Sequence, residues 1–119
     1  MSTFAWLVMG HLIGDWLLQS DWMAQEKKRG LFRLAGLTHF AIYAVIVIGA
    51  IWLSGMKGEH PAFYLALSAA AFLSHWLIDS TGLVECWMRF YQQSNLEVVR
   101  LMVDQTLHLL VLAVLAVLV

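Results

Sequence analysis

The chain has 119 residues, of which 61% are hydrophobic and only 13% are charged, and its formal net charge at pH 7 is −1. Soluble domains contain about 45–50% apolar and about 25% charged residues, so this composition argues against a soluble globular protein. The 7 basic residues form no run suited to a nucleic acid, and 8 acidic residues balance them. We therefore expect a protein of the lipid bilayer without a nucleic-acid partner.

Four segments are apolar and long enough to cross a bilayer, which takes about 17–25 residues. They are Thr3–Ser20, Leu34–Leu53, Pro61–Val84 and Leu101–Val119. A soluble helix bundle is the alternative, but four apolar segments in so short a chain leave too little polar sequence to cover it. Because the connections are short, neighbouring helices should run antiparallel. The sequence thus predicts an all-α protein, an integral membrane four-helix up-down bundle, with residues 1–119 forming one domain.

The connections between these segments carry nearly all the basic residues. The first connection holds four of them, Lys27, Lys28, Arg29 and Arg33. The third connection, Glu85–Arg100, holds two more, and Lys57 is alone in the second. The positive-inside rule therefore places the first and third connections in the cytoplasm and both termini in the periplasm. Apolar residues recur with a helical period in Glu85–Arg100, which predicts a short interfacial helix or an extension of the third span.

Three of the four apolar segments contain a histidine and an aspartate four positions apart. The pairs are His11 with Asp15, His75 with Asp79, and Asp104 with His108, and the remaining segment contains His39. Residues four apart lie on one face of a helix. An ionisable side chain at the bilayer centre costs about 2.5–3.5 kcal/mol on insertion scales, so these groups need partners.

The order of each pair predicts where it lies in the membrane. In the first and third segments the histidine precedes the aspartate, whereas in the fourth Asp104 precedes His108. The fourth helix also runs in the opposite direction, so the two reversals cancel. All three aspartates should then lie at one depth near the cytoplasmic side, with their histidines about 6 Å deeper. His39 falls in the same half of the membrane. We expect one cluster of seven side chains from four helices.

Imidazole and carboxylate groups together are typical ligands of one or two divalent transition-metal ions. Zinc, manganese, iron and cobalt all suit this ligand set, and an aspartate could bridge two ions. A single ion with supporting carboxylates is the other possibility. A site with an open position would activate water, which is the chemistry of a metal-dependent hydrolase. The predicted function is therefore metal binding, leaning towards hydrolysis of a membrane-associated substrate such as a lipid phosphoester.

Other functions fit some of the same residues. Facing aspartates and histidines also line proton or cation conduits. Four histidines could hold haem in a small haem- or metal-carrying subunit of a larger assembly, although haem does not account for three aspartates. Purely structural pairing between helices would satisfy the groups but not explain their shared depth. Gly10 and Gly14, four apart on the first segment, permit close helix approach and could support a homo-oligomer.

The motifs also carry a resemblance. The run HLIGDWLLQSDWMAQEK (His11–Lys27) resembles the opening of small bacterial membrane proteins in domain-of-unknown-function family 3307. The second-segment His39, the H-x-x-x-D pair in the third segment and D-Q-x-x-H in the fourth (Asp104–His108) are similar to the later motifs of that family. The resemblance implies a multi-pass protein of the bacterial inner membrane and brings no established activity. A looser similarity is to bacterial inner-membrane proteins labelled metal-dependent hydrolases.

Overall fold

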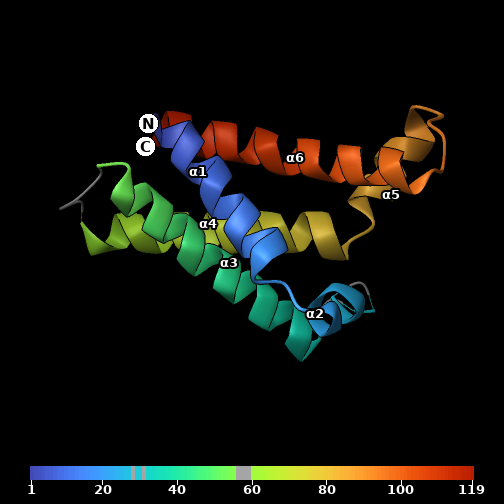
Figure 1. Cartoon of the computed structure of the whole chain (residues 1–119), viewed down its shortest axis with the longest axis horizontal. Coiled ribbons are helices and arrows are strands. Elements are labelled where there is room, and N and C mark those ends of the chain that lie inside the picture. The colour runs from blue at the N-terminus through green and yellow to red at the C-terminus, as the bar shows by residue number, and fades with distance from the viewer. Residues whose placement is uncertain (28, 31, 56–59) are drawn as a thin grey trace.

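The computed structural model describes residues 1–27, 29–30, 32–55 and 60–119, which form helices and loops with no β-strand among them (Figure 1). In chain order the elements are α1 (Thr3–Leu12), the π-helical turn η1 (Ile13–Leu17), α2 (Asp21–Glu26), α3 (Leu34–Leu53), α4 (Pro61–Ser80), α5 (Leu83–Phe90) and α6 (Glu97–Leu118). The all-α prediction is confirmed. Lys28 and Lys57, two of the basic residues behind the predicted topology, lie outside the described residues.

Local chemistry explains where several helices begin. The side chains of Ser2 and Ser20 accept hydrogen bonds from backbone N–H groups in the first turns of α1 and α2, at 3.2 and 3.3 Å. Pro61 is the first residue of α4, where its missing N–H costs nothing. Gly82 has a φ of 70° and separates α4 from α5, so the predicted third segment ends at Ser80 and a separate short helix follows it.

Among the described residues, α3, α4 and α6 are long and apolar enough to cross a membrane, with mean hydropathies of 2.1, 1.4 and 2.1. The predicted first span, Thr3–Ser20, is not one long α-helix. It consists of the 10 residues of α1 and the 5 of η1, and the chain then leaves the helix before α2. This run is shorter than the usual 17–25 residues. The structure therefore supports three candidate spans, and the four-helix membrane bundle is not confirmed.

Each of α1 and α4 packs against both α3 and α6. Successive long helices run in opposite directions, and the two termini lie at the same end of the molecule (Figure 1). Close packing of α1 on α3 depends on glycine, because a Cβ at Gly10 would lie 3.0 Å from the Cβ of Ala50 and one at Gly14 would lie 3.1 Å from the Tyr43 ring. The glycine pair thus permits close helix approach, as predicted, and α3 of the same chain covers it.

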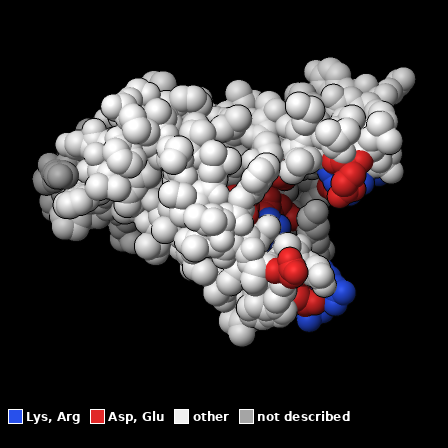
Figure 2. Space-filling model, viewed as in Figure 1, with Lys and Arg blue, Asp and Glu red and all other residues white. Residues whose placement is uncertain are grey.

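Apolar and polar residues occupy opposite ends of this helix assembly. The core near the termini is built from Leu7, Val47, Ile51 and Leu112, all at most 1% exposed. The outer surfaces of the long helices are also apolar, and Val117 is 86% exposed. Charged atoms gather instead in and around a hollow between α2 and α5, at the far end from the termini (Figures 1 and 2). An apolar body with one polar end is the surface pattern of a protein embedded in lipid.

Candidate metal centre

The seven predicted site residues come together at the inner edge of this polar end. Four helices and the turn η1 contribute them: His11 from α1, Asp15 from η1, His39 from α3, His75 and Asp79 from α4, and Asp104 and His108 from α6. All four histidines are at most 2% exposed. Asp104 has the most accessible carboxylate of the three, at 25% of its side chain. The cluster is therefore buried on the histidine side and open on the aspartate side.

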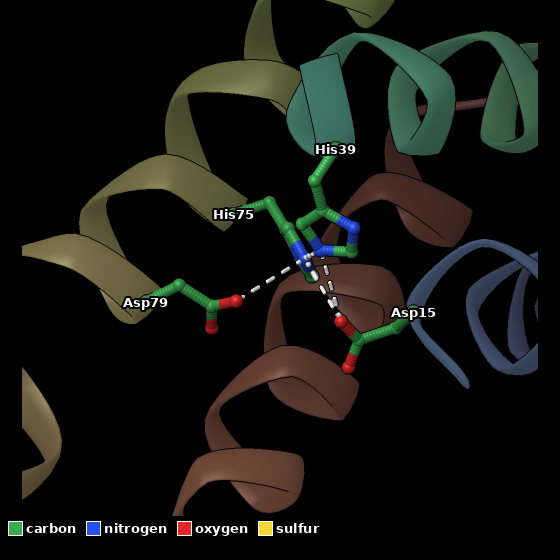
Figure 3. A group of neighbouring side chains, drawn as sticks. All are labelled: Asp15, His39, His75 and Asp79. Carbon is green, nitrogen blue, oxygen red and sulfur yellow. Dashed lines mark hydrogen bonds and ion pairs between the residues drawn. The ribbon is translucent and has the colours of Figure 1, made fainter. Parts of the chain in front are cut away.

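The first group of converging atoms comes from Asp15, His39, His75 and Asp79 (Figure 3). Asp15 Oδ1 lies 3.2 Å from both His39 Nε2 and His75 Nε2, and these two nitrogens are 3.0 Å apart. Asp79 Oδ2 lies 3.5 Å from His75 Nε2. Ligand atoms around a tetrahedral zinc ion, at about 2.0–2.1 Å from it, are separated by about 3.3 Å. The group therefore has the spacing of a metal-ligand set.

Asp15 reaches this group because it lies in the π-helical turn. A turn with more than 3.6 residues rotates the following side chains relative to an ordinary α-helix, and such turns occur frequently at functional sites. In this turn, Asp15 Oδ2 lies 4.0 Å from His11 Nε2. Its other oxygen, Oδ1, faces the imidazoles of His39 on α3 and His75 on α4. Asp15 Oδ1 accepts no hydrogen bond from any residue in the described part of the chain, which leaves a buried acceptor for a cation.

The second group comprises Asp79, Asp104 and His108, whose ligand atoms lie within 4.8 Å of one another. His108 Nδ1 donates to the backbone carbonyl of Asp104 at 2.9 Å. In a neutral imidazole this bond leaves Nε2 unprotonated, as in many metal-binding histidines. His108 Nε2 is buried without a hydrogen-bond partner among the described residues and lies 3.4 Å from Asp79 Oδ1. A proton on Nε2 or a cation held between the two atoms would remove the repulsion between their lone pairs.

Asp79 belongs to both groups through its two oxygens. Oδ2 faces His75 and Oδ1 faces His108. This is the arrangement of a carboxylate that bridges two ions, which in known two-metal sites are about 3.5–4 Å apart. The buried His and Asp groups could therefore hold one ion or two.

His11 lies beside the two groups and belongs to neither. Its Nε2 donates to Gln105 Oε1 at 2.9 Å, so its Nδ1 is the acceptor for the Tyr43 hydroxyl at 3.1 Å. The ring stacks on His108 with centroids 5.1 Å apart. Gln105 in turn donates through Nε2 to Asp15 Oδ2 and Asp104 Oδ2, at 3.2 and 3.1 Å. His11, Gln105 and Tyr43 thus orient the carboxylates and rings around them.

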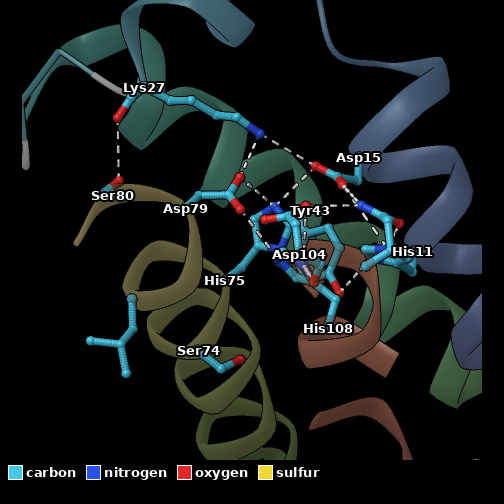
Figure 4. Close-up of polar contacts among 12 residues, drawn as sticks. His11, Asp15, Lys27, Tyr43, Ser74, His75, Asp79, Ser80, Asp104 and His108 are labelled. Carbon is cyan, nitrogen blue, oxygen red and sulfur yellow. Dashed lines mark hydrogen bonds and ion pairs between the residues drawn. The ribbon is translucent and has the colours of Figure 1, made fainter. Parts of the chain in front are cut away.

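Lys27 is the site residue that the sequence analysis missed (Figure 4). Its ammonium donates to Asp79 Oδ2 and lies 3.6 Å from Asp15 Oδ1, and the residue is only 8% exposed. Its backbone is fixed as well, because Ser80 Oγ donates to the Lys27 carbonyl and Gly36 leaves room for the Lys27 backbone. Burial alone would lower the pKa of Lys27, but the carboxylates of Asp79 and Asp15 raise it. Lys27 is therefore a cation.

A cavity of about 370 Å³ lies against the aspartate side of the cluster. Asp15, Asp79 and Asp104 line it, together with residues of α2, α4, α5 and α6. Arg100 also lines it, and its guanidinium donates to Glu85 Oε1 at 2.9 Å and to Asn95 Oδ1 at 3.0 Å. The hollow visible between α2 and α5 gives access to this cavity from outside (Figure 2). Small molecules can therefore approach the carboxylates without crossing the apolar core.

Comparison with known proteins identifies the family of this chain but no relative of known activity. No curated protein and no solved structure matches the chain. The looser similarity to metal-dependent hydrolases therefore finds no support. A family model with the description "Protein of unknown function (DUF3307)" matches residues 3–119, which is nearly the whole chain. The chain belongs to the DUF3307 family.

Proposed function

We propose that this protein is a multi-pass membrane protein that binds two divalent transition-metal ions at a centre bridged by Asp79. The observation that carries the proposal is the convergence of buried donor atoms that lack hydrogen-bond donors. Asp15 Oδ1 and His108 Nε2 both lack a hydrogen bond from the described residues, and each lies within 3.4 Å of another ligand atom. Burying such groups costs free energy, which a bound cation would offset. Zinc, manganese, iron and cobalt all suit these ligands.

The membrane arrangement proposed is four spans in a bacterial inner membrane, with both termini in the periplasm. Three spans are α3, α4 and α6, and the fourth is the run of α1 and η1. This run packs between α3 and α6 like the longer helices, and a short span is accommodated by local thinning of the bilayer at modest cost. Arg33 and Arg100 lie at the first turns of α3 and α6, at the polar end, where the positive-inside rule expects the cytoplasm.

The proposed activity is metal-dependent hydrolysis of a membrane-associated substrate. Only three of the described residues contribute to the second group, so an ion there would keep an open coordination position beside the cavity. A divalent ion in such a position supplies Lewis acidity and lowers the pKa of water near it. The chain itself would exclude bulk water from the histidine side and hold the carboxylates through Gln105 and Lys27.

The two alternatives fit less well. A proton or cation conduit would need polar groups across the whole bilayer, but the core between the cluster and the termini consists of apolar residues such as Leu7, Val47 and Leu115. Haem would need a flat space between its axial ligands. The four imidazoles instead pack on one another, with His75 and His108 centroids 4.4 Å apart. Both observations favour metal ions bound at fixed positions over a conduit for protons or cations, and over a haem group.

Metal analysis of the purified protein tests this proposal. We expect about two equivalents of metal by inductively coupled plasma mass spectrometry after purification in mild detergent without chelator. Asp79→Asn should lose both ions, because the amide offers one oxygen and no negative charge in place of two carboxylate oxygens. The matched control is His60→Asn, which removes an imidazole outside the cluster and keeps an acceptor at the start of α4. Metal content that is equal in all three proteins, or zero in the wild type, contradicts the proposal.

A further inference from the structure

The cavity beside the proposed metal centre has an unusual balance of charge. Among the described residues, five carboxylates line it, those of Asp15, Asp79, Glu85, Glu97 and Asp104, together with two cations, Lys27 and Arg100. Without metal these seven groups carry three excess negative charges and repel anions. Two divalent ions would bring four positive charges and leave the cavity with one excess positive charge. Metal binding would thus convert a wall that repels anions into one that attracts them.

Lys27 is the group most affected by this change. The Lys27 ammonium is neutralised by Asp79 and Asp15. If Asp79 bridges two ions, its lone pairs are used for metal coordination and the ammonium loses its strongest partner. The backbone of Lys27 remains fixed by Ser80 and Gly36, so the side chain stays on the cavity wall. The Lys27 ammonium is then available to an anion that enters the cavity from outside.

We propose that the metal-loaded cavity binds a phosphate-ester group, with Lys27 and Arg100 as its cationic contacts, and that this group is the headgroup of an anionic lipid. The inference rests on the proposed metal centre and names the ligand class of the same site. Pairs of divalent ions together with Lys or Arg are the usual means of binding phosphoryl groups. The volume of about 370 Å³ lies at the small end of the range of small-molecule sites, about 300–1,000 Å³.

The residues around the cavity mouth favour a lipid as the source of the phosphate. The hollow opens between α2 and α5 (Figures 1 and 2), and both helices present aromatic side chains to the outside. Trp22 on α2 is 53% exposed, and Trp87 and Phe90 on α5 are 44% and 77% exposed. Exposed tryptophans at the end of apolar helices are typical of the headgroup level of a bilayer. The mouth then lies where lipid phosphates are concentrated.

Titration calorimetry with sn-glycerol 3-phosphate tests the binding step. We expect saturable binding to the metal-loaded protein in detergent and none after chelation. Lys27→Met should weaken binding at least about tenfold, since a charge-assisted hydrogen bond is lost, while Lys27→Arg should retain it. Arg89→Gln, which removes a cation that does not line the cavity, is the matched control. Equal binding by wild type and Lys27→Met, or binding that survives chelation, overturns the inference.

Two further measurements distinguish failure of the anion site from failure of the metal centre and from a wrong assignment to a lipid. Metal content is measured on every sample, so a protein with two ions that binds no glycerol phosphate overturns the anion site and leaves the metal centre intact. Loss of metal itself overturns the proposed function instead. Phosphatidic acid in mixed micelles should bind at least about tenfold more tightly than glycerol phosphate if the acyl chains stay in the bilayer region. Equal affinity for the two probes overturns the assignment to a lipid.

Discussion

The two ends of the helix assembly are built on different principles. Near the termini, the apolar side chains of Leu7, Val47 and Leu112 fill the space between the helices and contribute through packing. At the other end, His11 and Asp15 are also buried and Gln105 is half-buried, and each depends on particular partner atoms. Packing tolerates exchange of one apolar side chain for another of similar volume, whereas a buried polar network loses stability when one member is removed. The first end holds the helices together, and the second fixes the position of charges.

Substitution of Lys27 should lower the stability of the protein, and the loss should be largest when no metal is bound. Lys27→Met leaves Asp15 and Asp79 as uncompensated buried carboxylates, and removal of one partner of a buried ion pair costs about 3–5 kcal/mol. We expect a large fall in the unfolding temperature of the chelated protein in detergent, followed by circular dichroism. Added zinc should restore most of the loss, because divalent ions replace the missing charge. An unchanged unfolding temperature of the chelated variant would show that Lys27 is not a counter-ion.

Truncation in the apolar end should have a comparable effect on stability and none on metal. Leu112 is 1% exposed within the core near the termini, and Leu112→Ala should cost about 2–5 kcal/mol from the cavity it leaves. The same unfolding measurement checks the stability, and mass spectrometry of the metal checks the site. If Leu112→Ala lost metal as well, the two ends would be one cooperative unit rather than two.

A smaller effect is expected where α1 approaches α3. Gly10→Ala places a Cβ 3.0 Å from the Cβ of Ala50, and overpacking of this kind costs about 1–3 kcal/mol. Gly49→Ala is the matched control, because a Cβ at Gly49 meets no described atom within 4 Å. We expect a lower unfolding temperature only for Gly10→Ala, together with weaker metal binding as α1 moves His11 and Asp15. Equal behaviour of the two variants would mean that α1 adjusts its position freely.

Much of the candidate site could be predicted from sequence because helices impose a simple period. Spacing of four residues and the alternation of chain direction predicted that the three aspartates lie at one end. The structure brings six of the seven predicted side chains into two groups of possible ligands, and His11 lies beside them. An aspartate that bridges two ions stays a prediction, and the sequence pattern did not single out Asp79. These predictions depend only on helix geometry, which the apolar segments specify strongly.

Other features could not be predicted because they depend on tertiary contacts or on local departures from the α-helix. The π-helical turn changes the direction of Asp15 and shortens the first span. Lys27 directly follows the short helix α2, outside the spans, and the docking of α2 on α3 brings it to Asp79. In the sequence, Tyr43 is one residue of the apolar segment that forms α3. Its role depends on the tertiary structure, in which its hydroxyl donates to His11 Nδ1. A signal that could have pointed to Lys27 is the need of buried carboxylates for a fixed cation.

X-ray absorption spectroscopy of the zinc- or manganese-loaded protein would detect a centre bridged by Asp79. We expect imidazole and carboxylate scattering from the first coordination shell and a metal–metal distance of about 3.5–4 Å. Both the metal–metal feature and most of the bound metal should disappear in Asp79→Asn. A spectrum with oxygen ligands alone, or one that Asp79→Asn leaves unchanged, would contradict a centre bridged by Asp79.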